Sequence, residues 1–349
     1  MTRAFPRDMA NDQPAAYVEL QAVSNFSFLR GASHADELVE RAAALGLAAI
    51  GIADRNTLAG AVRAHVAAKA AGLRLLTGAR LDLACGLSLL CYPRDRAAYG
   101  RLCRLLTLGQ RRAAKGGCVL HRDDVTAHAE GQVLIALPPG RLDEEAGEED
   151  GEPFAAALAA LRRRHAGPLY LAAHMLYRGD DMSRLNRLAA LAERHETPLV
   201  ATNDVHYHTR ERRPLQDVLT AIRERVTVVQ AGYRLAANAE RHLKSGAEMA
   251  RLFRGHEDAV ARTLEIVRLC TFSLDELAYE YPDEPVPPGT TPQQHLEALT
   301  WAGAGQYYPE GIPAKVRRAL MHELGLIAEL GYAPYFLTVY DIVRFAREK

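Results

Sequence analysis

The sequence predicts an α/β protein built around a parallel sheet or barrel. Short apolar runs alternate along the chain with helical patterns of roughly 12 residues, and Gly46 and Gly72 close the first two helices. Apolar strands that alternate with helices form right-handed βαβ units, whose strands lie parallel to one another. The length of 349 residues suggests about two domains at roughly 150 residues each.

The elements of the first domain can be placed in order. Ser33 is the expected N-cap of a helix because Asp36 and Glu37 would follow in its first turn. The expected strands cover residues 17–23, 47–53, 73–77, 133–137, 169–173 and 198–202, and the expected helices cover 33–45, 57–71, 154–165, 183–195 and part of 248–270. Residues 101–115 form an amphipathic pattern with a basic face. We interpret that face as solvated rather than as a phosphate-backbone contact, because no aromatic residue is interleaved with it.

Two other stretches are expected to lie outside regular structure. Residues 142–153 are rich in Asp and Glu and predict a solvated acidic loop. Residues 281–292 contain five prolines and predict a linker. Helical periodicity resumes at 295–308 and 314–330, so a shorter helical region is expected to follow the linker.

Composition excludes several classes of protein. The 43 Lys+Arg balance 43 Asp+Glu, so any nucleic-acid contact must be local rather than the result of a global positive field. The five cysteines lack CxxC spacing, which is typical of reduced thiols in the cytoplasm rather than of disulfides or thiolate zinc sites. No run approaches the ~20 apolar residues of a membrane span. The N-terminus lacks the apolar core of a secretory signal.

Polar side chains follow several of the expected strands, where α/β proteins carry their active sites. These strand ends hold Asn25 and Ser27, residues 54–56, residues 78–80 and residues 203–208. Asp204 and His206 could both reach a metal ion, but a metal needs three or four ligands. From spacing alone we therefore interpret His206 as a loop histidine and Asp204 as a helix cap. The chain has no Walker loop, no GxGxxG and no GxSxG motif, and His121 to Asp124 is interpreted as a polar turn.

Longer segments resemble a known family. Residues 17–33, YVELQAVSNFSFLRGAS, resemble the opening motif of the polymerase-and-histidinol-phosphatase (PHP) domain, in the form found in the damage-inducible, error-prone branch of bacterial C-family DNA polymerase III alpha subunits. Residues 48–60, 186–222 and 242–249 agree with this family, and residues 323–346 resemble the beginning of its palm domain.

The resemblance implies a distorted (β/α)7 TIM-like PHP barrel followed by the first helices of the polymerase palm region. The implied organisation is a disordered N-terminus at 1–16, a PHP domain at 17–280, a proline-rich linker at 281–292 and a truncated start of the polymerase core at 293–349. In this family the Gly-Arg-Gly-Ser element and the aspartates that hold two Mg²⁺ ions come later in the chain. We therefore expect no catalytic residue and no cofactor in this fragment, and no activity from it alone.

For the full-length protein the resemblance implies a DNA-directed DNA polymerase that acts in damage-induced mutagenesis, translesion synthesis and DNA repair. Its substrates would be DNA and deoxynucleoside triphosphates, and Mg²⁺ would be its cofactor. A sliding clamp and companion mutagenesis proteins are the implied partners. The implied location is the cytoplasm, without a membrane.

The chain departs from the family at the metal-binding motifs. Metal-binding PHP domains open with His-x-His-Ser-x-x-Ser-x-x-Asp-Gly, whereas this chain has neither histidine nor the aspartate, and only the last motif is intact. The degenerate metal-site positions are Gln21, Val23, Arg30, Asp54, Arg55, Arg80, Asp204 and His206. Glutamine, valine and arginine cannot replace imidazole and carboxylate ligands, and arginine has no acceptor lone pair. We therefore expect a structural PHP domain that binds no metal.

Two alternatives stay open. The first is an active metal-dependent phosphoesterase or 3′–5′ exonuclease, which the lost ligands argue against. The second is a standalone PHP-like interaction module, which the palm-like segment argues against.

We also predict what replaces the metals. Arginine–carboxylate pairs should fill the old site, because two facing carboxylates need neutralisation and guanidinium groups bind them in a bidentate manner. Asp54 and Asp204 are the expected carboxylates. Arg55 and Arg80 are the expected partners, whereas for Arg30 pairing and exposure to solvent are weighted equally.

Overall fold

The computed structural model describes residues 16–140, 142, 153–277 and 286–349. The chain divides into two compact units, Met1–Leu277 and Ala278–Lys349. Residues 1–15, most of the acidic stretch at 142–153 and residues 281–285 of the expected linker lie outside the described residues.

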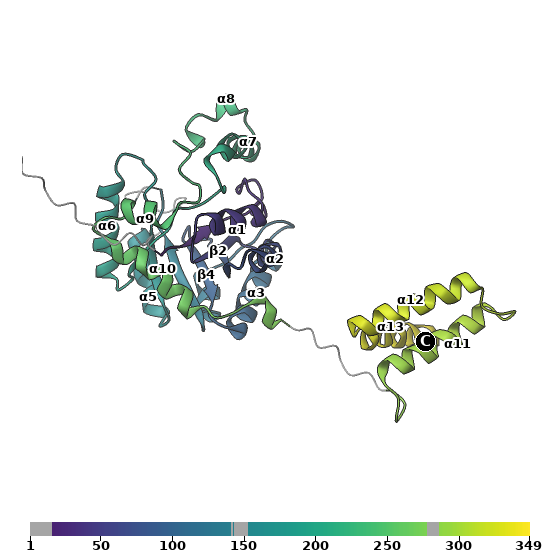
Figure 1. Cartoon of the computed structure of the whole chain (residues 1–349). Coiled ribbons are helices and arrows are strands. Elements are labelled where there is room, and N and C mark those ends of the chain that lie inside the picture. The colour runs from purple at the N-terminus through teal and green to yellow at the C-terminus, as the bar shows by residue number, and fades with distance from the viewer. Residues whose placement is uncertain (1–15, 141, 143–152, 278–285) are drawn as a thin grey trace, which may run out of the picture. The chain divides into compact units, whose positions relative to one another are not determined.

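The first unit is built on a seven-stranded sheet in which each strand pairs with the next along the chain (Figure 1). The strands are β1 (Val18–Ala22), β2 (Ala49–Arg55), β3 (Arg74–Asp82), β4 (Ser88–Pro93), β5 (Gln132–Leu137), β6 (Leu169–Ala173) and β7 (Leu199–Ala201). All neighbouring pairs are parallel except those made by β4, which runs antiparallel to β3 and β5.

The two edges of the sheet meet at the carboxyl ends of the strands. The Val23 backbone nitrogen donates to the Val205 carbonyl at 3.0 Å, and the Val205 nitrogen donates to the Gln21 carbonyl at 2.8 Å. These bonds join the end of β1 to the loop after β7. The fold is therefore the distorted TIM-like barrel that the sequence predicts, and the antiparallel β4, which follows β3 without a helix, is its main distortion.

Alternate residues of the strands pack on two sides. One set, which includes Ile50 and Leu89, lies against the helices outside the sheet, and the other set, which includes Leu20 and Tyr92, packs with Ile266. The helices of the first unit are α1 (Ala35–Ala44), α2 (Ala61–Ala71), α3 (Arg96–Arg112), α4 (Arg122–Ala127), α5 (Phe154–Arg164), α6 (Asp181–Arg194), α7 (Arg213–Glu224), α8 (Val228–Ala231), α9 (Gly246–Leu252) and α10 (Glu257–Leu269). This two-sided burial explains why the strands read as continuous apolar runs.

The aromatic ring of Tyr92 fills the inner side of the sheet because two strands carry glycine beside it. A Cβ on Gly78 would lie 2.5 Å from Tyr92 Cδ1, and a Cβ on Gly51 would lie 2.4 Å from its hydroxyl oxygen. The Tyr92 hydroxyl donates to the Leu20 carbonyl, so a buried polar group is satisfied.

Several boundaries differ from the sequence prediction for identifiable reasons. The helix expected at 101–115 begins at Arg96, because the Asp95 side chain accepts from the Ala98 nitrogen at 2.8 Å and caps it. The pattern at 248–270 breaks into α9 and α10 around Gly255, whose φ is +84°. The expected polar turn at 121–124 is the start of α4, in which Asp124 accepts from the His121 nitrogen.

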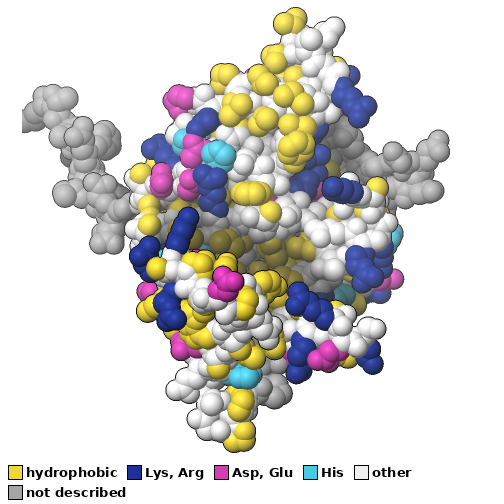
Figure 2. Space-filling view, turned by 90° about the vertical axis from the view of Figure 1, so that its right-hand side faces the viewer, with side chains coloured by type: hydrophobic (Ala, Val, Ile, Leu, Met, Phe, Trp, Pro, Cys, Tyr) yellow, Lys and Arg dark blue, Asp and Glu magenta, His cyan; other side chains and the backbone are white. Residues whose placement is uncertain are grey.

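Helices α7 and α8 stand away from the sheet (Figure 1) and carry exposed apolar side chains, among them Ile222 and Val229. Figure 2 shows hydrophobic side chains exposed among arginines and lysines on the surface.

The second unit contains α11 (Pro292–Tyr307), α12 (Ala314–Leu330) and α13 (Ala333–Glu348) around a small core of Leu296, Leu324, Ala333 and Leu337. Within the described residues no single helix is long and apolar enough to cross a membrane, and the pair α12 and α13 reaches that length only across a bend of 118°.

Candidate functional site

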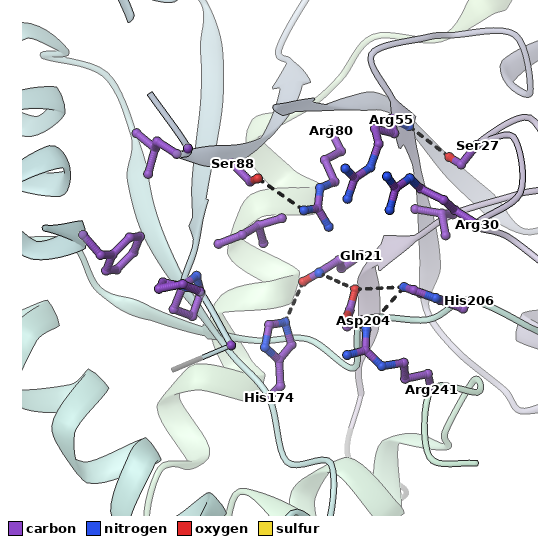
Figure 3. A pocket seen from close by; sticks show the side chains of 18 of the residues that line it. Gln21, Ser27, Arg30, Arg55, Arg80, Ser88, His174, Asp204, His206 and Arg241 are labelled. Carbon is purple, nitrogen blue, oxygen red and sulfur yellow. Dashed lines mark hydrogen bonds and ion pairs between the residues drawn. The ribbon is translucent and has the colours of Figure 1, made fainter. Parts of the chain in front are cut away.

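A cavity of about 320 Å³ lies at the carboxyl ends of the strands. Of the eight degenerate metal-site positions, the cavity is lined by Gln21, Val23, Arg30, Arg55, Arg80, Asp204 and His206. These residues come from β1, β2, β3 and the loops after β1 and β7 (Figure 3). The cavity thus brings seven of these eight side chains together, and Asp54 is not among its lining residues.

Gln21 stands where a metal-binding PHP domain would have its first histidine, and both the nitrogen and the oxygen of its amide are hydrogen-bonded. The amide nitrogen donates to Asp204 Oδ1 at 2.8 Å. The amide oxygen accepts from the Thr202 hydroxyl at 2.9 Å and lies 2.8 Å from His174 Nε2. Because that oxygen can only accept, His174 Nε2 carries its proton. Desolvation lowers the pKa of His174 to about 3, so its imidazole is neutral.

Asp204 is buried and held by Arg241 and His206, neither of which was predicted as its partner. Arg241 pairs with Oδ2, and His206 Nε2 lies 3.5 Å from Oδ1. Burial alone would raise the pKa of Asp204, but Arg241 and His206 outweigh it and hold that pKa well below its usual range. Asp204 is therefore an ionised carboxylate.

The prediction that an arginine pairs with Asp54 is wrong. Asp54 accepts hydrogen bonds from the Ser24 nitrogen at 2.8 Å, the Ser24 hydroxyl at 2.7 Å and the Ser27 hydroxyl at 2.7 Å. Burial raises the pKa of Asp54 against the effect of these bonds. Gly60 packs closely on it, because a Cβ there would lie 2.5 Å from Asp54 Oδ2. Asp54 thus anchors the loop after β1.

Arg55 and Arg80 pair with Asp82 instead. Arg55 Nη1 lies 2.6 Å from Asp82 Oδ2, and Arg80 Nε lies 2.9 Å from Asp82 Oδ1. The two arginines face each other in the register of β2 and β3, so a carboxylate is needed to offset their repulsion. Burial and the neighbouring Arg80 lower the pKa of Arg55 to about 10. Asp82 is two residues from Arg80 on the same strand face, and that spacing was the signal available in the sequence.

Arg30 is half-buried beside this pair, with its guanidinium group near those of Arg55 and Arg80 (Figure 3). Within the described residues no hydrogen bond or ion pair reaches the Arg30 side chain. Burial, together with the charges of Arg223 and Arg80, lowers the pKa of Arg30. Of the two fates weighed for Arg30, pairing with a carboxylate does not occur.

The donor set does not fit a divalent cation. Both Asp204 oxygens are engaged by Gln21 and Arg241, and His174 directs its proton to Gln21. Among the described residues no group of three or more His, Cys, Asp or Glu side chains is placed to hold a metal.

The basic face of α3 is partly neutralised by ion pairs within the protein, because Arg101 pairs with Glu130 and Arg112 with Asp124.

Comparison with known proteins agrees with this geometry. Residues 19–166 match the model of the PHP domain, and residues 294–349 match the model of the bacterial DNA polymerase III alpha NTPase domain. The error-prone DNA polymerase of Bradyrhizobium sp. (strain ORS 278) is 54% identical over 346 residues, covering 96% of this chain and 29% of that protein. That of Caulobacter vibrioides is 53% identical over 336 residues, covering 96% of this chain and 30% of that protein.

A solved structure with a partly similar fold is a putative metal-dependent phosphoesterase from Bifidobacterium adolescentis. It is 19% identical with a TM-score of 0.42, and the alignment covers 55% of this chain and 88% of that one.

The first unit is thus a PHP domain with an altered site. The chain belongs to the bacterial error-prone DNA polymerases of the polymerase III alpha type, as their N-terminal, PHP-containing part. It spans about 30% of the length of these relatives.

Proposed function

We propose that this chain is the N-terminal part of a DNA-directed DNA polymerase that acts in damage-induced mutagenesis, translesion synthesis and DNA repair. The support is the identity of 54% to an error-prone DNA polymerase across nearly the whole chain. The whole polymerase would act in the cytoplasm on DNA and deoxynucleoside triphosphates with Mg²⁺. A sliding clamp and companion mutagenesis proteins would be its partners.

Within that polymerase we propose that the PHP barrel is a structural domain that works without metal. The observation that carries this is the Gln21–Asp204–Arg241 arrangement. The Gln21 amide and the Arg241 guanidinium group bind both carboxylate oxygens of Asp204, which belongs to the one metal-binding motif that is intact in this chain. A cation at this place would have to displace them and tolerate Arg55 and Arg80 in the same cavity.

Primer extension on templates with a defined lesion tests the first proposal. The full-length protein should extend past the lesion with Mg²⁺, and the 349-residue chain alone should transfer no nucleotide. Lesion bypass that is absent from the full-length protein contradicts the proposal. So does extension by the 349-residue chain that survives repurification.

An exonuclease assay tests the metal-free barrel against the rival phosphoesterase or 3′–5′ exonuclease. The 349-residue chain with Mn²⁺, Zn²⁺ or Mg²⁺ should release no nucleotide from a labelled 3′ end. Release that is lost in Asp204→Asn, while that variant keeps its thermal stability, would establish the rival. The standalone interaction module is disfavoured by the match of residues 294–349 to a polymerase family model.

A further inference from the structure

The cavity at the carboxyl ends of the strands carries a large excess of positive charge. Among its described lining residues are six arginines and one carboxylate: Arg30, Arg55, Arg80, Arg178, Arg184, Arg241 and Asp204. Asp82 is not a lining residue but pairs with two of these arginines, so among the described residues the six guanidinium groups share two paired carboxylates. The charges of Asp180 and Asp181 act on Arg184 from outside the lining. His174 and His206 add no charge at neutral pH, because desolvation lowers the pKa of both.

The pairing of these groups leaves several cations without a carboxylate. Asp82 serves Arg55 and Arg80 together, and Asp204 serves Arg241. Arg184, on α6, donates to the carbonyl oxygens of Pro139 at 2.6 Å and Gly140 at 3.1 Å. Arg178 reaches the same Gly140 oxygen at 3.5 Å. Carbonyl oxygens orient these guanidinium groups but do not neutralise them.

Arg30 shows most clearly that a partner is missing. It is half-buried, no carboxylate of the described residues contacts it, and it lies beside Arg55 and Arg80 (Figure 3). Crowding of half-buried like charges costs free energy, which an anion bound among them recovers. Arg30, Arg55 and Arg80 come from the loop after β1, from β2 and from β3, whereas Arg178 and Arg184 come from the loop after β6 and from α6.

We propose that this cavity binds a phosphate-bearing anion, a diphosphate or a terminal phosphate monoester, directly through guanidinium groups and without metal. Planar guanidinium groups match phosphate oxygens in a bidentate manner. The volume of about 320 Å³ is at the small end of ligand sites, which suits such a group. The proposal rests on the cavity alone and does not require polymerase activity.

Two sources can supply this chemistry, a free diphosphate or the phosphorylated end of a nucleotide or strand. A second, open groove shares Arg30 and Arg55 with the cavity and is also lined by Phe26, Phe28 and Lys115. Phe28 is 81% exposed, and an exposed aromatic ring beside cations can stack on a base. The experiment therefore distinguishes the two sources.

Calorimetric titration of the 349-residue chain with inorganic pyrophosphate, in EDTA and at constant ionic strength, tests the site. We expect saturable binding that Arg30→Ala weakens about tenfold, as the loss of one charge-assisted contact predicts. Arg30→Ala should leave the Tm of the free protein unchanged or higher, because no carboxylate loses its partner. Arg63→Ala removes the same charge from an exposed pair with Asp36 on the surface and should bind pyrophosphate as the unmodified chain does.

Competition with 5′-phosphorylated and unphosphorylated oligothymidylate identifies the source. Displacement of pyrophosphate by the phosphorylated oligomer alone supports a strand end as the ligand, and displacement by neither supports a free anion. Equal displacement by both oligomers overturns the proposal, because it indicates a groove for the strand backbone. Absence of saturable pyrophosphate binding, or equal binding by Arg30→Ala, also overturns it.

Discussion

The side-chain amide of Gln21 donates to Asp204 Oδ1 at 2.8 Å, and this bond ties β1 to the loop after β7. The backbone bond from the Val205 nitrogen to the Gln21 carbonyl lies next to it. Gln21 and Asp204 stand where the family's metal-binding members have metal ligands. In this chain the two residues close the barrel through hydrogen bonds instead. Arg241 completes the arrangement from the other oxygen of Asp204.

Asp82→Asn should lower the free energy of unfolding by about 2 kcal/mol, because it leaves two partly buried guanidinium groups facing each other. Double-mutant analysis by urea denaturation is the measurement, with Arg55→Ala as the second change. The double variant should lose less than the sum of the two single losses. Asp36→Asn, which breaks the exposed pair with Arg63, is the matched control and should cost under about 1 kcal/mol. Equal losses of unfolding free energy in Asp82→Asn and Asp36→Asn would show that the partly buried pairs of Asp82 contribute no more to stability than an exposed pair.

Gly78→Ala should destabilise the barrel by about 1–3 kcal/mol, because the added Cβ meets the Tyr92 ring at 2.5 Å and the core there is closely packed. Gly100→Ala is the control, since its Cβ would have no neighbour nearer than the flexible end of Arg104 at 3.9 Å. Alanine in the interior of α3 should be neutral or stabilising by up to about 1 kcal/mol. Thermal unfolding of both variants decides the matter, and a stable Gly78→Ala protein would contradict the packing described for Tyr92.

Glu19 should make stability fall as pH rises toward neutrality. Its carboxylate is buried, accepts from the Tyr17 hydroxyl at 2.9 Å and from the Gln21 nitrogen at 2.7 Å, and burial raises its pKa from 4.5 to about 7. The folded pKa exceeds the unfolded one, so the favourable contribution is complete below 4.5 and is lost as pH rises through about 7. The whole loss is on the order of 3 kcal/mol.

Urea denaturation at a series of pH values compares the unmodified chain with Glu19→Gln. The difference between the two free energies should change between pH 4.5 and 7, the interval between the two pKa values. Buried neutral histidines such as His174 act in the opposite direction, but they are common to both proteins and cancel in the difference. Parallel pH profiles would show that Glu19 does not titrate in this interval.

Chelation should not affect folding of the barrel. Where a metal holds a site together, its removal takes away folding free energy, whereas here Gln21 and Arg241 occupy both oxygens of Asp204. The Tm measured with and without EDTA should therefore be the same. A fall of several degrees that Zn²⁺ or Mn²⁺ reverses would contradict the prediction.

The barrel was largely predictable from the sequence because its strands are apolar on both faces and its first two helices end next to Gly46 and Gly72. Strand β6 and helix α12 were placed at the residues the structure shows. Strand β4 was missed because it returns from β3 by a tight turn at Gly86, without the crossover helix that marks the other strands.

The site was predictable in its members but not in its pairings. Arginine–carboxylate pairing was expected and is present, but Asp54 bonds to Ser24 and Ser27 because the loop after β1 folds back over it. Asp82 could have been found from its two-residue spacing to Arg80. Arg241 could not, since it lies 37 residues from Asp204 in an irregular segment and only the tertiary fold brings the two together. His174 directly follows a predicted strand, and that position was a usable signal.

The metal content of the purified chain tests the central claim most directly. The 349-residue chain should be produced in medium supplemented with Mn²⁺, Zn²⁺ and Fe²⁺, purified without chelators and measured by inductively coupled plasma mass spectrometry, with Asp204→Asn alongside. Because guanidinium and amide groups hold the last intact metal-motif carboxylate, we expect far less than one metal ion per chain in both proteins. A stoichiometric metal in the unmodified chain that disappears in Asp204→Asn would contradict the account.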